Sequence, residues 1–144
     1  MSAFWFFFGL SGRISRSQFW LGMLGVAATI GCAIAVVFWT PFGYAAIPMV
    51  LIAFVALYII AIKRLHDRNK SGWWTLVFLW APGVMDRLSD KLVEESAGWW
   101  ILVLIGTVLT LWGLVELGFR RGTDGDNEYG PDPLQKTEVT APAL

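Results

Sequence analysis

The sequence predicts an all-α, polytopic membrane bundle of about four transmembrane helices with a short periplasmic amphipathic helix. Hydrophobic residues make up 56% of the 144 residues and charged residues only 15%, a balance far from that of soluble domains. Residues 17–62 contain no Asp, Glu, Lys or Arg, and a soluble domain of this size could not keep all of that stretch away from water. The charges lie instead in the joints between apolar runs, which indicates a chain that crosses a bilayer repeatedly.

The first two spans form a predicted hairpin. Ser15 and Gln18 fit a capping box, so a helix should begin there, just before the apolar run opens. Residues 20–39 give roughly 28 Å of helix at about 1.5 Å per residue, close to the roughly 30 Å hydrocarbon core, with a tryptophan at each end. A short uncharged turn follows, and the second span covers residues 45–62. Small residues recur at helical spacing in the first span and predict close helix packing: Gly22, Gly25, Ala28 and Cys32.

The second half of the chain is less regular. Residues 71–85 are uncharged but give only roughly 22 Å of helix, and Pro82 and Gly83 weaken their end. From Met85 onward, apolar and charged residues take opposite faces, which predicts an amphipathic helix in the membrane interface. Residues 97–115 form a further apolar span. We therefore expect one integral membrane domain over residues 1–134 and a disordered tail over residues 135–144.

The distribution of basic residues predicts the orientation. With four spans, eight basic residues share a side with the two termini and two lie on the other side, which places both termini in the cytoplasm. A three-span arrangement with residues 71–85 re-entrant gives the same ratio, so the count fixes only the first two helices. We favour four spans, because an uncharged run at membrane depth is most simply satisfied as a helix.

Three segments carry a resemblance to a known family. They are Gly-Arg-Ile-Ser-Arg-Ser-Gln-Phe-Trp at residues 12–20, Lys-Arg-Leu-His-Asp at 63–67 with Ser-Gly-Trp-Trp at 71–74, and a tail with Gly-Thr at 122–123, Asn127 and Tyr-Gly-Pro-Asp-Pro at 129–133. In this order around membrane helices they resemble the bacterial domain-of-unknown-function 805 family. The resemblance implies a small inner-membrane protein without an established activity. Residues 86–96 and the span after them depart from the family's usual three-segment pattern.

The candidate binding residues come from these same segments. Arg13 and Arg16 lie one turn apart at a helix start, where they either set orientation or clamp lipid phosphates. The basic loop after residue 62 and the turn-rich tail are expected to meet on the cytoplasmic face. We predict a site for anionic lipid or a protein partner that comprises Arg13, Arg16, Lys63, Arg64, His66, Asp67, Asn127 and Tyr129.

Other classes of function are disfavoured by the residues present. One histidine and one cysteine build neither a zinc site nor a catalytic triad, and the acidic tail lacks the spacing of a calcium loop. We expect no catalytic residue, metal, cofactor or nucleic-acid partner. The leading prediction is a non-enzymatic inner-membrane protein that contacts membrane lipid, a membrane protein or another copy of itself. The alternative is a small-solute transporter or channel subunit that acts as an oligomer.

Overall fold

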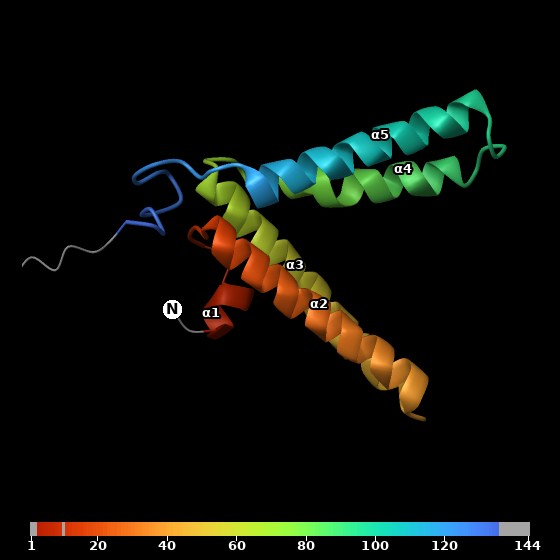
Figure 1. The fold of residues 1–144 in the computed structure, drawn as a ribbon, viewed down its shortest axis with the longest axis horizontal. Helices are drawn as coiled ribbons and strands as arrows, with labels where there is room; N and C mark the ends of the chain where they lie inside the picture. The colour runs from red at the N-terminus through yellow and green to blue at the C-terminus, as the bar shows by residue number, and fades with distance from the viewer. Residues whose placement is uncertain (1–2, 10, 136–144) are drawn as a thin grey trace, which may run out of the picture.

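The protein consists of two helical hairpins joined at one end. The computed structural model describes residues 3–9 and 11–135, so most of the predicted disordered tail, residues 136–144, lies outside the described residues. Helices α2 (Arg16–Trp39) and α3 (Ala46–Asp67) pack side by side, connected by the short 3-10 helix η1 (Gly43–Ala45). Helices α4 (Ala81–Ser89) and α5 (Ala97–Leu114) form the second pair. The two pairs diverge from the end where the tail lies (Figure 1).

The membrane character and the all-α class are confirmed. Within the described residues, three helical stretches are long and apolar enough to span a bilayer: Arg16–Trp39, Gly43–Asp67 and Ala97–Phe119. The described residues contain helices and turns, with a single isolated β-bridge between Asn127 and Gly130. The capping box is also present, because the Ser15 hydroxyl accepts from the Gln18 amide nitrogen at 3.3 Å and the Gln18 side chain accepts from the Ser15 amide at 2.9 Å.

The third helix is longer than expected, and it replaces the separate amphipathic helix. The π-helix η2 (Leu76–Trp80) leads directly into α4, so the chain is helical over residues 74–89. Pro82 cannot donate a backbone hydrogen bond to the carbonyl of Phe78, and the wide π turn lies directly before it. The backbone continues past Met85 without a break and turns only at residues 90–96. The prediction of an independent periplasmic amphipathic helix is corrected, because its first residues continue the helix over residues 74–89, which is roughly 24 Å long at about 1.5 Å per residue.

The short helix α1 (Ala3–Phe8) packs against the first hairpin. A Cβ atom on Gly22 would lie 2.8 Å from the Ile60 side chain and 3.1 Å from Phe6, and one on Gly25 would lie 3.2 Å from Phe7. Because these two glycines have no side chain, α1 and α3 can pack closely against α2. The other members of the predicted small-residue face, Ala28 and Cys32, are exposed in the described chain.

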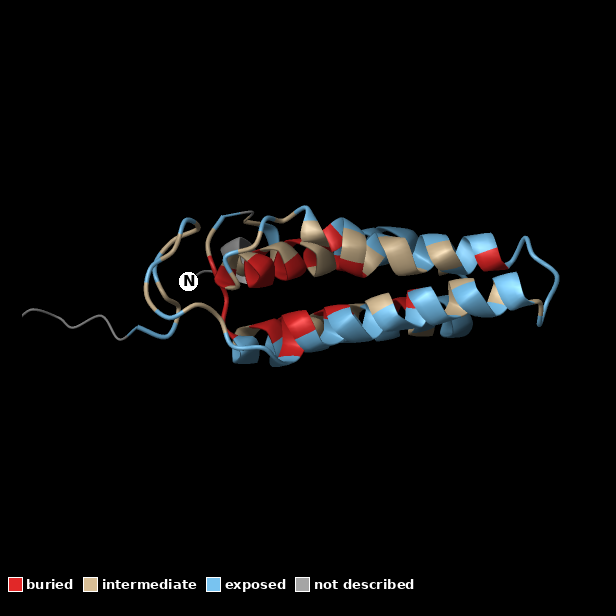
Figure 2. Ribbon diagram, turned by 90° about the horizontal axis from the view of Figure 1, so that it is seen from above, coloured by how far each residue is buried: buried red, intermediate tan, exposed pale blue. Residues whose placement is uncertain are grey.

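The buried residues gather at the end of the molecule where the hairpins meet (Figure 2). The core there joins residues from both hairpins and from the segment before α2, including Ile14, Ile60, Phe78 and Leu117. Toward the other end, the helices expose mostly apolar side chains, as helices surrounded by lipid do. The polar residues of the predicted site lie at the buried end.

Candidate functional site: a buried arginine network

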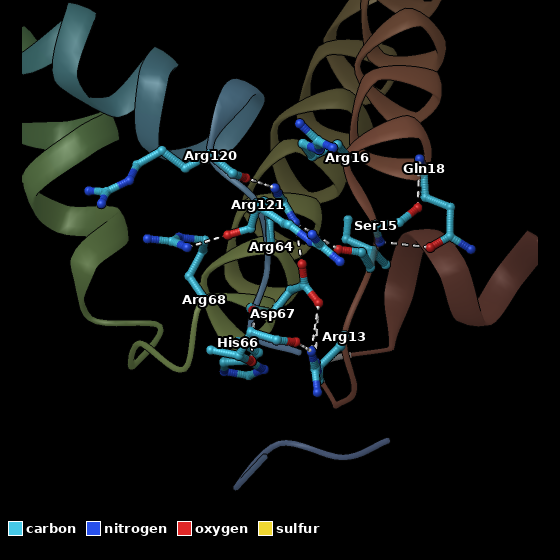
Figure 3. A network of polar contacts seen from close by, with 12 residues as sticks. Arg13, Ser15, Arg16, Gln18, Arg64, His66, Asp67, Arg68, Arg120 and Arg121 are labelled. Carbon is cyan, nitrogen blue, oxygen red and sulfur yellow. Dashed lines mark hydrogen bonds and ion pairs between the residues drawn. The ribbon is translucent and has the colours of Figure 1, made fainter. Parts of the chain in front are cut away.

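A buried carboxylate lies between two arginines at the junction of the hairpins. The Arg13 Nε donates to one oxygen of Asp67 at 3.1 Å, and Arg64 Nη1 donates to the other oxygen. The side chains are 1% exposed for Arg13, 0% for Arg64 and 4% for Asp67. Figure 3 shows the two guanidinium groups approaching Asp67 from two sides. We call these three residues the arginine triad.

The triad carries one excess positive charge, which backbone carbonyls surround. Arg13 donates to the carbonyl oxygens of Thr123 at 2.6 Å, Gly125 at 2.6 Å and Gly130 at 3.2 Å. All three carbonyls belong to the tail. In the described part of the chain, no buried side-chain nitrogen or oxygen is without a hydrogen-bond partner. Charged groups taken out of water need this full satisfaction, and Arg13 thereby ties the segment before α2 to the tail.

The other arginine of the triad closes the end of the last helix. Arg64 Nε donates to the Leu117 carbonyl at 2.8 Å, and Nη2 donates to the Arg120 carbonyl. The last carbonyls of a helix have no partner within it, and cations are favoured there. The π-helix η3 (Val115–Phe119) extends α5 at this point. Its Gly118 carbonyl accepts from Trp20 Nε1 at 3.1 Å and its Phe119 carbonyl from Arg16 at 3.3 Å.

A second ion cluster lies beside the triad and was missed by sequence reasoning. Glu116 is fully buried and is paired with Lys70 at 2.9 Å, Arg120 at 3.0 Å and Arg68 at 3.2 Å. The Lys70 ammonium also lies 4.8 Å from the centre of the Trp74 ring. Of these three pairs, only the one with Arg120 follows from helical spacing, because the two residues are four positions apart. Glu116 is the single charged residue in residues 97–119, and that isolation was the available signal.

The tail docks on the end of α3. The rings of His66 and Tyr129 are stacked with centres 4.0 Å apart and planes 6° apart. Asn127 donates to the His66 carbonyl and to the Thr123 hydroxyl, both at 2.9 Å. The expected contact between tail and basic loop is therefore confirmed, whereas a ligand-binding role for these residues stays a prediction.

One aspartate holds the tail turns in shape. The Asp132 carboxylate accepts from the backbone nitrogens of Leu134 at 2.9 Å and Gly125 at 3.1 Å. The hydrogen bond from Leu134 is the main cause that lowers the pKa of the Asp132 carboxyl below its ordinary value. The turn that presents the Gly125 carbonyl to Arg13 is thus anchored by a charged group.

Lys63 points to a different part of the molecule. It is fully buried, and its ammonium donates to the carbonyl oxygen of Phe6 at 2.9 Å. This bond satisfies a carbonyl near the end of α1. Lys63 therefore holds α1 against α3, one helical turn before His66 and Asp67.

Most of the predicted binding residues form contacts within the protein and are not fully exposed to solvent or lipid. Arg13, Lys63, Arg64 and Asp67 are buried, and Arg16 alone among the eight is exposed. The remaining three, His66, Asn127 and Tyr129, are half-buried. A cavity beside the triad has a volume of about 20 Å³, which is room for a water but not for a headgroup. The residues that the structure describes contain no group of three or more His, Cys, Asp or Glu placed to hold a metal ion.

Comparison with known proteins identifies the family. The model of the family described as "Protein of unknown function (DUF805)" matches residues 7–131, a range that contains both ion clusters and the docked tail turns. The chain belongs to the DUF805 family. Its apolar helices and its similarity to two relatives named as inner membrane proteins indicate an inner-membrane protein.

The relatives of this DUF805 protein include three from Escherichia coli K12. The chain is 29% identical to inner membrane protein YhaI over 128 residues, covering 87% of this chain and 86% of the relative. It is 27% identical to uncharacterized protein YiiR over 132 residues, with the same coverage. It is 26% identical to inner membrane protein YhaH over 131 residues, covering 87% of each chain. No solved structure matches the chain.

Proposed function

We propose that this DUF805 protein is a non-enzymatic inner-membrane protein whose cytoplasmic face binds anionic lipid. The observation that carries the proposal is the separation of its basic residues into two groups. The triad and Lys63 are buried. The side chains of Arg120 and Arg121 are 55% and 70% exposed although they pair with Glu116 and Asp124, and Arg16 is exposed as well. We call these three exposed residues the arginine face.

The position of the arginine face favours lipid as its ligand. Arg16 begins α2, and Arg120 and Arg121 follow directly after η3, so all three lie at the ends of apolar helices. Basic residues at such ends attract anionic headgroups, with a contribution of about 1 kcal/mol each. Arg16 and Arg121 also line the same small cavity. In this proposal the buried network fixes the positions of the helix ends, so that the three guanidinium groups lie at the same depth in the membrane interface.

The same network supports an orientation with both ends in the cytoplasm. Arg13 contacts carbonyls of the tail, so the segments before α2 and after η3 lie on one side of the bilayer. A chain that starts and finishes on one side crosses an even number of times. Among the described residues three helices are long enough to span, so we infer that the helix over residues 74–89 is the fourth crossing. The excess of basic residues supports a cytoplasmic position for this end.

The test is retention of phosphatidylglycerol by the purified protein, counted by native mass spectrometry in a mixture with phosphatidylcholine. The combined variant Arg16→Gln, Arg120→Gln, Arg121→Gln should lose most of the preference for phosphatidylglycerol. A matched variant with lysine at the same three positions keeps the charges and should keep most of the preference. Lys136→Gln, in the tail beyond the described residues, is a control for the loss of a single charge elsewhere.

Two results would overturn the proposal. One is undiminished phosphatidylglycerol retention by a folded glutamine variant. The other is a protein that copurifies with the wild type from native membranes, is lost with the glutamine variant, and is accompanied by no change in lipid retention. In that case the arginine face would be a docking surface for a protein partner.

A further inference from the structure

The helix over residues 74–89, which comprises η2 and α4 and is called the third helix below, has charged residues at two different grooves. Arg87 and Lys91 line the groove between α3 and the η2–α4 helix. Asp86 lines a different groove, between α4 and α5. Among the residues that the structure describes, neither Arg87 nor Lys91 forms an ion pair, and both are exposed. The groove on the α3 side is therefore lined by two unneutralised cations and by no acidic residue.

The remainder of that groove is apolar and aromatic. Its lining comes from α3 and from the third helix, and it has a volume of about 440 Å³, within the range of about 300 to 1,000 Å³ typical of small-molecule sites. Phe54, Tyr58 and Trp80 form one wall, with ring centres 5.1 to 6.3 Å apart. The groove lies between α3 and the helix over residues 74–89, and the hairpins to which these helices belong diverge away from the tail (Figure 1).

Along the helix, apolar residues are followed by basic residues, in the same order as the acyl chains and the headgroup of a phospholipid. From Trp80 to Arg87 the third helix rises roughly 10 Å at about 1.5 Å per residue, away from the buried network and toward the opposite membrane surface. In the four-span orientation proposed above, the apolar wall lies at the depth of acyl chains, and Arg87 and Lys91 lie one turn apart near the headgroups. A guanidinium group and an ammonium group side by side are suited to a phosphate with two free oxygens.

We propose that this groove, defined by Phe54, Tyr58, Trp80, Val84, Arg87 and Lys91, is a binding site for one anionic phospholipid. The phosphate lies between Arg87 and Lys91, and an acyl chain follows the aromatic wall. This site goes beyond the arginine face, because it lies at the far end of the third helix and uses none of the same residues. A second copy of the chain is the less favourable occupant, since it would bury two cations without partners in the groove.

The first test uses phosphatidylglycerol titrated into the purified full chain, with phosphatidylcholine as the neutral competitor. Native mass spectrometry counts the bound lipids. The variant Arg87→Gln, Lys91→Gln should bind one of the phosphatidylglycerol molecules roughly tenfold to thirtyfold more weakly, the effect of two interfacial charges. Removal of the arginine face should leave this binding step unchanged, so the two proposals fail separately. Undiminished binding by the Arg87→Gln, Lys91→Gln variant would overturn the site.

The second test fills the groove without altering its charge. Val84→Trp places a large ring in the groove, whereas Val108→Trp makes the same change on α5; both valines are about half exposed, at 46% and 53%. We expect Val84→Trp to lose the same phosphatidylglycerol molecule and Val108→Trp to retain it. If the wild type is a dimer that Val84→Trp separates while lipid binding is unchanged, the groove is an interface between copies and the lipid site is wrong.

Discussion

At the scale of the residue, the central feature is a carboxylate shared by two arginines that do not face solvent. A buried ion pair is weak evidence for stability by itself, because the desolvation of the charges can exceed their attraction. The hydrogen bonds from Arg13 and Arg64 to backbone carbonyls instead specify which parts of the chain meet, because they join segments more than 50 residues apart. We interpret the triad as the device that selects one arrangement of the hairpins and the tail.

Replacement of Arg64 should therefore be more harmful than replacement of an exposed arginine. Arg64→Lys retains the charge but cannot reach the Leu117 and Arg120 carbonyls together with Asp67, and each buried group left without a partner costs about 1 to 3 kcal/mol. Arg16→Lys, at the exposed start of α2, should cost no more than about 1 kcal/mol. Thermal unfolding in detergent, followed by tryptophan fluorescence, compares the two variants. Equal unfolding temperatures would show that the triad does not hold the fold together.

The sequence predicted the meeting of these residues but not their burial. The apolar runs located the helix ends, and the composition of loop and tail suggested that they dock. The sequence alone does not distinguish a basic residue at a helix end that extends to lipid headgroups from one that points into the protein. Arg13 is held inside the protein by the backbone carbonyls of residues 123, 125 and 130. Every residue has a backbone carbonyl, so the sequence does not indicate which ones act as acceptors.

At the scale of the element, hydrophobic patterning located most helices and missed two details. The start of α2 follows from its capping box, and the helices of the first hairpin follow from their uncharged runs. The extent of the helix over residues 74–89 did not follow, because the sequence predicts a run over residues 71–85 whose end Pro82 and Gly83 weaken. They lie inside it instead, next to the π turn that accommodates the proline. The α1 contact with Gly22 and Gly25 also depends on tertiary packing alone.

The first span provides a direct test of the lipid-facing assignment. Ala28 is exposed near the middle of α2, so Ala28→Asp places a carboxylate against lipid at a cost of roughly 2.5 to 3.5 kcal/mol on insertion scales. The variant should accumulate poorly in the membrane fraction. Ala97→Asp is the control, because an acidic residue in the first turn of α5 is favoured by the helix dipole. Normal accumulation of the Ala28 variant would count against a span centred there.

At the scale of the whole molecule, two hairpins are fastened at one end and are separate at the other. The all-α membrane class and the order of the helices could be predicted from composition and from the placement of charge. The divergence of the hairpins could not, because it is set by the packing of Phe78 and Leu117 with the core of the first hairpin. The fastened end brings the segment before α2 into contact with the tail, and the open end leaves the groove of Arg87 and Lys91 facing the bilayer.

This arrangement makes a definite statement about topology, which fusion of alkaline phosphatase tests most directly. The enzyme needs an oxidising compartment to form its disulfides, so it reports which segments reach the periplasm. Fused to the tail after residue 135 it should be inactive, and inserted at Asp90, in the turn between α4 and α5, it should be active. Active phosphatase on the tail would place Arg13 and the Thr123 carbonyl on opposite sides of the membrane. The buried network could then not exist in the cell, and the account built on it would be contradicted.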